Sequence, residues 1–76
     1  MRICSLSDLE LGGRARVSDI HPGSAIRERL RGLGLIEGTE VTCLRKSPLG
    51  DPAAFLIRGA VIAIRSEDSS CVRVEM

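Results

Sequence analysis

The stretch RERLRGLGLIEGTEV, at positions 27–41, places three glycines within 15 residues and so limits how far any regular element can extend. Gly34 follows a helical pattern of leucines and falls at the C′ position, where a positive φ favours glycine. Leu30 and Leu35 then occupy C3 and C″, whose side chains meet in a Schellman motif. Gly38 falls at the third position of a β-turn, where a type II turn requires a positive φ. The sequence therefore predicts a helix stop and a tight turn in close succession, followed at once by a strand.

The helix before this stop is expected to span residues 24–33, with Ser24 as its N-cap. Its apolar stripe consists of Ile26, Leu30 and Leu33, at i, i+4 and i+7. Gly32 lies inside the last turn at a cost in helix propensity, which indicates the close approach of a neighbouring element. A further short turn of helix is expected at residues 7–9, in SLSDLELGG.

Five further segments have strand character, because most of them alternate apolar and polar side chains at a period of two. They are RARVSDI (14–20), TEVTCLRK (39–46), AAFLIR (53–58), AVIAIR (60–65) and CVRVE (71–75). Ile20 breaks the alternation of the first segment, which indicates a bulge near Asp19. A tight turn at 58–59 or 59–60 joins the third segment to the fourth. Residues 60–64 are apolar throughout, so we expect a strand covered on both faces.

The 76-residue chain is expected to form a single domain over residues 1–76, near the size at which one core is only just sufficient. Phe55 is its one aromatic residue, so the core must consist mainly of aliphatic side chains. A flat sheet of five short strands would leave its edges and one face uncovered. We therefore predict a mainly β fold, a small SH3-like barrel of about five strands with one short α-helix (24–33) between the first and second long strands.

The composition argues against several classes of partner. Eleven basic and ten acidic residues leave a net charge of +1, whereas nucleic-acid binders commonly carry a clear basic excess on one face. One aromatic residue provides neither stacking platforms for single-stranded nucleic acid nor the aromatic groove that binds polyproline helices. No apolar run approaches the roughly 20 residues of a membrane helix. We therefore expect no nucleic-acid partner and no membrane-embedded segment.

Cys4, Cys43 and Cys71 are odd in number and widely spaced, and we expect no signal peptide ahead of them. This pattern indicates reduced thiols and a cytoplasmic location. The chain lacks the short Cys, His and carboxylate spacings of dedicated transition-metal sites. Cys43 and Cys71 fit small buried hydrophobic positions, with convergence of cysteines and His21 on a metal ion as the alternative. No cofactor is expected to be required, although weak binding of Fe(II) or another transition metal stays compatible with the sequence.

Catalytic chemistry has little support in the sequence. A nucleophile needs a base to activate it, and an acid–base pair needs a pocket. The cluster SEDSS at 66–70 combines serines and carboxylates, but such neighbours are typical of a solvated turn or helix cap. No glycine-rich phosphate loop with a following lysine is present. The chain is therefore not predicted to be an enzyme and, in particular, not a GTPase.

Three motifs resemble those of the ferrous-iron transport protein A family (FeoA) in order and spacing. They are RLRGLGL at 29–35, GT at 38–39 and PLGDP at 48–52. With VIAIRSEDSSCVRVE at 61–75, the resemblance extends from about Leu6 to Glu75. The family usually has proline where this chain has Glu37, and both residues tolerate the φ of that corner.

The resemblance implies an SH3-like barrel in the bacterial cytoplasm that assists a membrane ferrous-iron transporter with a cytoplasmic GTPase domain, the FeoB protein. The chain would then act as an accessory or regulatory interaction module, peripheral to the inner membrane through its partner. Similar domains form the C-terminal part of metal-dependent transcription regulators. The alternative is therefore a metal-responsive regulatory domain that binds a transition metal ion and modulates a partner. The sequence specifies no oligomeric state.

Partner binding is assigned to the helix and to the loop at 47–52. The predicted partner-binding residues are Arg27, Arg29, Arg31, Leu49 and Asp51. Arginine is the cation favoured at protein interfaces, because its planar fork offers several donors and little hydration to remove. The alternatives are a solvated helix face partly neutralised by Glu28, and a Leu49 side chain folded back over one end of the barrel. The predicted structural turns use Gly34, Gly38, Pro48, Gly50 and Pro52.

Overall fold

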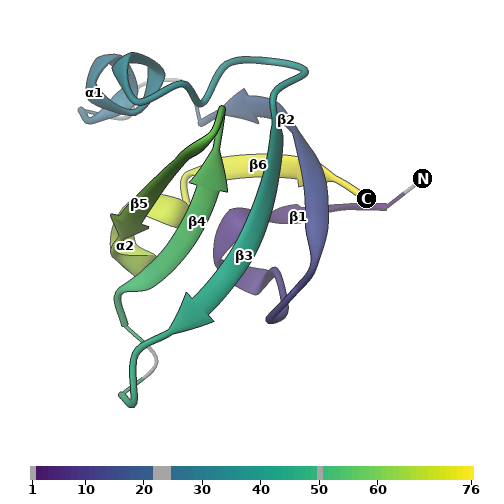
Figure 1. Ribbon diagram of the computed structural model, residues 1–76. Helices are drawn as coiled ribbons and strands as arrows, with labels where there is room; N and C mark the ends of the chain where they lie inside the picture. The colour runs from purple at the N-terminus through teal and green to yellow at the C-terminus, as the bar shows by residue number, and fades with distance from the viewer. Residues whose placement is uncertain (1, 22–24, 50) are drawn as a thin grey trace.

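The computed structural model describes residues 2–21, 25–49 and 51–76. Its elements in chain order are β1 (Ile3–Ser5), the 3-10 helix η1 (Leu6–Asp8), β2 (Arg14–Ile20), α1 (Arg27–Gly32), β3 (Glu40–Lys46), β4 (Ala53–Ile57), β5 (Ala60–Ile64), α2 (Ser66–Ser69) and β6 (Val72–Glu75). The strands form one antiparallel sheet in the order β1-β6-β2-β3-β4-β5, which curls around the interior (Figure 1). The prediction of a mainly β fold is confirmed. No helix in the described ranges has the length and apolar character that a membrane crossing requires.

The sheet has one more strand than the sequence predicted, and the chain has two short helices beyond α1, of which η1 overlaps the helical turn expected at 7–9 and α2 does not correspond to a predicted helix. β1 is only three residues long, so it offers no period-two pattern to detect, and it exists through pairing with β6 at the far end of the chain. α2 is a four-residue helix in the segment that the sequence assigned to a turn or cap. Both elements depend on contacts between distant segments, which local patterns do not reveal.

The core is aliphatic apart from one ring and one thiol, as the composition required. Phe55 and Cys43 are both buried at its centre. The remaining buried hydrophobic residues are Leu6, Leu9, Ala15, Val17, Ile20, Leu30, Leu35, Val41, Ile57, Ile64, Val72 and Val74. Burial of these side chains is the main favourable term for folding.

The helix stop at Gly34 is confirmed in full. Gly34 has φ +104°, and its N–H donates to the carbonyl of Arg31 at 3.0 Å. The Leu35 N–H donates to the carbonyl of Leu30 at 3.2 Å, which completes the Schellman pair of hydrogen bonds. Leu30 and Leu35 are both buried. The clasp thus satisfies the helix end and places two leucines in the core.

The second predicted turn joins this corner to β2. Gly38 has φ +88°, and the Thr39 N–H donates to the carbonyl of Ile36 at 3.0 Å across the turn. The Gly38 N–H donates to the carbonyl of Val17 at 2.8 Å, and the Val17 N–H donates to Thr39 at 2.9 Å. The turn is therefore fixed beside the middle of β2.

The helix is shorter than predicted. α1 begins at Arg27 with Ile26 as its N-cap, and the predicted capping role of Ser24 lies outside the described residues. Of the apolar stripe only Leu30 is buried, because the core position beyond it is filled by Leu35 after the stop. The close approach expected at Gly32 is wrong, since a Cβ there would meet no atom within 4 Å.

Two irregularities of the sheet follow the sequence. The register of β2 against β6 shifts between Val17 and Asp19, as expected for a bulge. The β4–β5 hairpin turns at Arg58 and Gly59, which have φ values of +51° and +83°. These values fit a two-residue type I′ turn at 58–59, which is one of the two turn positions that the sequence allowed.

The prediction that residues 60–64 are covered on both faces is wrong. Within β5 only Ile64 is buried, while Val61 is 60% exposed. β5 is the last strand of the sheet, and in Figure 1 the short helices lie near its ends instead of across its outer face. The part of this apolar run around Val61 therefore lies at the surface, whereas Ile64 faces the core.

The two glycines of the α1 region provide a matched test of the clasp. Gly34→Ala should lower the free energy of unfolding by roughly 1–2 kcal/mol, because an L-residue is strained at positive φ. A Cβ there would also lie 3.2 Å from Ile57 Cγ2 and 3.0 Å from Arg58 Cδ. Gly32→Ala, at a helical position with free space, should instead raise it by about 0.5–1 kcal/mol. Urea denaturation measures both, and equal effects would contradict the role assigned to Gly34.

Candidate partner-binding groove

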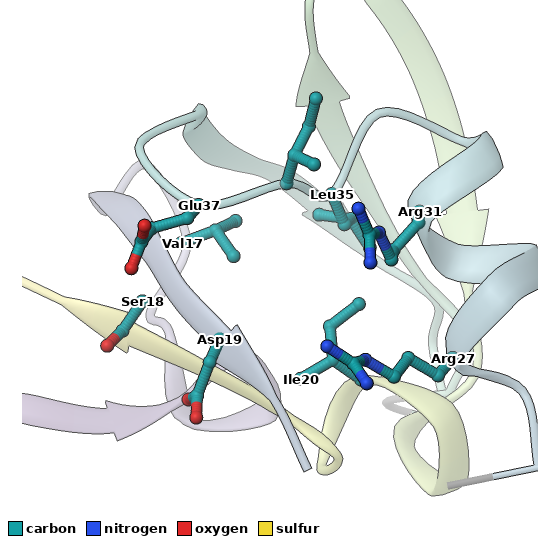
Figure 2. Close-up of a pocket in the computed structure, with 9 residues that line it drawn as sticks. Val17, Ser18, Asp19, Ile20, Arg27, Arg31, Leu35 and Glu37 are labelled. Atoms are coloured by element: carbon teal, nitrogen blue, oxygen red, sulfur yellow. The ribbon is translucent and has the colours of Figure 1, made fainter. Parts of the chain in front are cut away.

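A groove of about 230 Å³ lies between α1, β2 and the turn that joins α1 to β3 (Figure 2). Its lining residues are Val17, Ser18, Asp19 and Ile20 of β2, Arg27 and Arg31 of α1, and Leu35, Ile36 and Glu37 of the turn. The Gly34 and Gly38 corners set its shape, because they carry the chain from the end of α1 back to the middle of β2.

Two guanidinium groups form the helix side of the groove. Arg27 and Arg31 are four residues apart, so they lie on the same side of α1. Figure 2 shows their side chains extending from the helix toward the groove. Neither makes an ion pair or a side-chain hydrogen bond with any other described residue. Both cations are therefore available to a carboxylate of a partner.

The base of the groove is apolar. Val17, Ile20 and Leu35 are buried side chains whose surfaces close the groove from below, and Ile36 is partly exposed beside them. A partner segment would thus meet mainly the side chain of Ile36, which is 38% exposed, next to the two cations. Arginine combined with apolar surface is typical of the central part of protein interfaces.

Acidic side chains lie on the β2 side. Arg73 of β6 donates to both carboxylate oxygens of Asp19, with Nε 2.6 Å from Oδ1. These hydrogen bonds from Arg73 lower the pKa of Asp19 below its ordinary 3.8, against the opposing effect of desolvation, and the charge of Arg27 adds a smaller lowering. Glu37 lies on the same side in Figure 2 and makes no ion pair with a described residue. Asp19 is thus neutralised by Arg73, and Glu37 remains as the groove carboxylate without an ion pair to a described residue.

The third helix arginine has a different environment. Arg29 donates to Asp68 of α2 at 2.8 Å, and Asp68 is only 17% exposed. The pair links the two helices and directs Arg29 away from the groove. Of the three predicted arginines, the groove therefore contains Arg27 and Arg31 alone.

The β3–β4 loop lies at the opposite end of the molecule from α1 (Figure 1). Leu49 is 94% exposed, so the alternative in which it folds back over the barrel is wrong. Asp51 Oδ1 accepts a hydrogen bond from the Ser66 N–H at 2.7 Å and so caps the first turn of α2. The Ser47 N–H donates to the carbonyl of Pro52 at 3.2 Å across the base of the loop. The structure therefore separates Leu49 and Asp51 from the groove.

The remaining predicted turn residues lie in the same loop. Pro48 precedes Leu49 in a turn, and the Asp51–Pro52 peptide bond is cis. The predicted role of Gly50 lies outside the described residues.

Potential metal ligands do not converge in the described ranges. There, no three His, Cys, Asp or Glu side chains are placed to hold a metal ion. Cys43 is fully buried, and Cys4 and Cys71 are partly buried free thiols. Cys71 Sγ donates to the carbonyl of Glu67 at 3.7 Å, whereas His21 is exposed. Cys43 thus fills the hydrophobic position that the sequence indicated.

A family model described as the FeoA domain matches residues 4–76. The chain belongs to the FeoA domain family. It is similar to the FeoA-like protein from Clostridium acetobutylicum, solved by NMR, with 29% identity and a TM-score of 0.94 over 100% of this chain and 88% of that one. This match supports the sheet order and the placement of α1 described above.

A second solved relative is FeoA of Stenotrophomonas maltophilia, crystallised with zinc and described as an SH3 domain protein. It is 33% identical, with a TM-score of 0.81 over 93% of this chain and 88% of that one. The SH3-like barrel predicted for this FeoA-domain chain is thereby confirmed.

A curated relative combines two proteins in one chain. It is a fusion of Fe(2+) transport protein A with the Fe(2+) transporter FeoB in Porphyromonas gingivalis, 28% identical over 71 residues. The match covers 93% of this chain but only 8% of the fusion protein. In that relative, Fe(2+) transport protein A is thus covalently joined to the transporter FeoB.

Sequence reasoning found the cationic side of the groove but not the acidic one. The sequence indicates Asp19 only as the site of a bulge and Glu37 only as a departure from the family pattern. The bulge was the available signal, because an extra residue in a strand often re-aims a neighbouring side chain.

The contact between Asp51 and α2 predicts a stability effect. Asp51→Ala should lower the free energy of unfolding by about 0.5–2 kcal/mol, as expected for loss of a capping side chain. Asp51→Asn keeps an oxygen acceptor for the Ser66 N–H and should retain most of the stability. Thermal denaturation of both variants measures the effect, and an equal loss in both would contradict the capping role.

The lowered pKa of Asp19 predicts a dependence on pH. A carboxyl whose pKa is depressed in the folded state stabilises the fold above its ordinary pKa of 3.8, and this contribution is lost as the pH falls through the lowered value. The wild type should therefore unfold at a higher temperature than Asp19→Asn at pH 7, and the difference should shrink as the pH falls below 3.8. Glu10→Gln, in an exposed loop, is the control and should show no such pattern. A difference for Asp19→Asn that is independent of pH would contradict the ion pair with Arg73.

Proposed function

We propose that this FeoA-domain chain is a non-catalytic accessory module of ferrous-iron uptake. In this proposal it binds the cytoplasmic part of a membrane ferrous-iron transporter with a GTPase domain, of the FeoB type. The observation that carries the proposal is the α1–β2 groove, where Arg27 and Arg31 have no partner in the described structure and border an apolar base.

The relatives support this choice of partner. In Porphyromonas gingivalis the two components form one polypeptide, and covalent linkage of this kind replaces binding in solution by a high effective concentration. The Stenotrophomonas maltophilia relative is described as a possible bacterial ferrous iron transport activating factor, a role suited to a module that acts on a transporter. For this chain we propose the corresponding contact.

The proposal assigns GTP chemistry to the partner. Two hydroxyl groups and a carboxylate lie close together at η1. Ser5 Oγ is 2.6 Å from Ser7 Oγ and 3.1 Å from Asp8 Oδ2. These groups form a local network at η1, without an imidazole to act as a base. In our proposal the chain needs no cofactor and acts at the cytoplasmic face of the membrane that holds the transporter.

A metal-responsive domain is the second candidate, and the zinc complex of the Stenotrophomonas relative is the observation that favours it. Calorimetry with anaerobic Fe(II) distinguishes the two. Tight stoichiometric binding that is lost on His21→Ala or Cys43→Ser would support the metal-responsive domain. Absence of such binding would leave the interaction module.

The proposed contact is tested by charge reversal in the groove. Arg27→Glu combined with Arg31→Glu should weaken binding to the full-length transporter in lipid nanodiscs by at least about tenfold, equivalent to ~1.4 kcal/mol. Both side chains project from the helix surface, so circular dichroism should show an unchanged fold. Biolayer interferometry measures the affinity.

Arg14→Glu is the matched control, because Arg14 is an exposed arginine at the other end of β2. It should leave the affinity within twofold of wild type, as judged against the tenfold step above. Leu49→Ser tests the loop separately. Unchanged binding by the double variant would exclude the groove, and no binding by the wild-type chain would exclude the partner.

A further inference from the structure

The outer edge of β5 carries free main-chain groups. β5 is last in the sheet order, and no described strand pairs with its second edge. In a two-residue hairpin the residues that flank the turn, here Ile57 and Ala60, form a hydrogen-bonded pair. Along the ladder, non-hydrogen-bonded and hydrogen-bonded pairs then alternate. The N–H and C=O groups of Val61 and Ala63 therefore point away from β4. Neither residue takes part in the backbone hydrogen bonds that the described residues form outside the regular ladders and helices.

This edge lacks the features that normally protect an exposed strand. Natural edges are short or carry charges, proline or a bulge, which discourage pairing with another chain. The opposite edge, β1, is only three residues long. β5 has five residues, all apolar, in a register with β4 that has no bulge. On its outer face the exposed Val61 lies directly opposite the partly exposed Leu56 of β4.

We propose that β5 pairs with β5 of a second copy of this chain, in antiparallel orientation about a two-fold axis through Ile62. In this register Val61 of each copy faces Ala63 of the other. All four residues present outward-directed N–H and C=O groups, so each pair can exchange both hydrogen bonds. The two Ile62 residues then face each other in a non-hydrogen-bonded pair, where side chains approach most closely. The inference is independent of the proposed function.

This register places the outward-directed backbone groups of one copy opposite those of the other, over the whole length of β5. A shift by one residue would set the free groups of one copy against groups that already bond to β4. A shift by two residues again sets outward-directed backbone groups opposite each other, but it leaves part of residues 60–64 without an apolar partner. The pairing about Ile62 is therefore the one that matches the whole five-residue run to itself.

The charged residues at the ends of β5 are also compatible with pairing to a second copy. Arg65 of one copy lies opposite Gly59 of the other, and Arg58 lies opposite Ser66, next to the exposed Glu67. The register therefore sets no like charges directly opposite, an arrangement that would be destabilising. None of the groove residues belongs to β4 or β5, so a dimer would present two grooves.

The interface is small, because one five-residue strand pair buries less than the ~800 Å² per partner of typical stable complexes. We therefore expect reversible dimerisation that depends on concentration. Sedimentation velocity of the wild-type chain across a wide concentration range should show exchange between monomer and dimer. In hydrogen-exchange NMR, the amides of Val61 and Ala63 should become protected as the concentration rises.

Two variants disrupt the pairing in different ways. Val61→Lys adds a charge at an exposed position, and Ala63→Pro removes only the outward N–H, which leaves the ladder with β4 in place. Each should raise the dimer dissociation constant at least about tenfold. Leu11→Lys is the control, since Leu11 is exposed and apolar but lies in the loop before β2, and it should leave dimerisation unchanged.

A chain that stays monomeric at millimolar concentration would overturn the inference. A dimer unaffected by Val61→Lys and by Ala63→Pro would do so as well, because self-association would then use another surface. The same conclusion would follow if the Val61 and Ala63 amides exchanged at a rate independent of concentration while the dimer formed.

Discussion

The Schellman clasp at the end of α1 is the constraint on which the groove depends. Its hydrogen bond from Leu35 to Leu30 ends the helix after a turn and a half and buries both leucines. The chain then needs only a few residues to reach Gly38, whose backbone is fixed to Val17 of β2. A longer helix or a looser exit would place the arginines of α1 elsewhere. Backbone geometry at two glycines thus determines which side chains face each other across the groove.

Two ion pairs determine which arginines and carboxylates near the groove are already occupied, in a chain with a net charge of +1. Two exposed arginines elsewhere are satisfied within the fold, Arg29 by Asp68 and Arg73 by Asp19. Exposed pairs of this kind contribute little to stability, but they fix the direction of the side chains involved. Because Asp19 is taken by Arg73, it competes less for the cations on α1.

The sequence predicted those features that are fixed by neighbouring residues. Gly34 and Gly38 were assigned correctly because positive φ is a local requirement, and the bulge near Asp19 was visible as a break in alternation. α2 and β1 were missed, since one is capped by Asp51 from another loop and the other pairs with the opposite end of the chain. The same limit applies to the site. The arginines of α1 could be proposed from their spacing, whereas the acidic side of the groove arises from tertiary packing.

The scarcity of aromatic residues changes how an SH3-like barrel can recognise a partner. Its one ring, Phe55, is in the core, so the surface cannot offer the stacked aromatic groove that binds polyproline segments. Guanidinium groups beside aliphatic atoms are what the groove offers instead. Attraction to such exposed charges is screened over about 8 Å at physiological ionic strength, while contact with the apolar base is not. Recognition at this groove should therefore divide into a salt-sensitive encounter through the arginines and a salt-insensitive contact with the exposed aliphatic surface beside them, mainly that of Ile36.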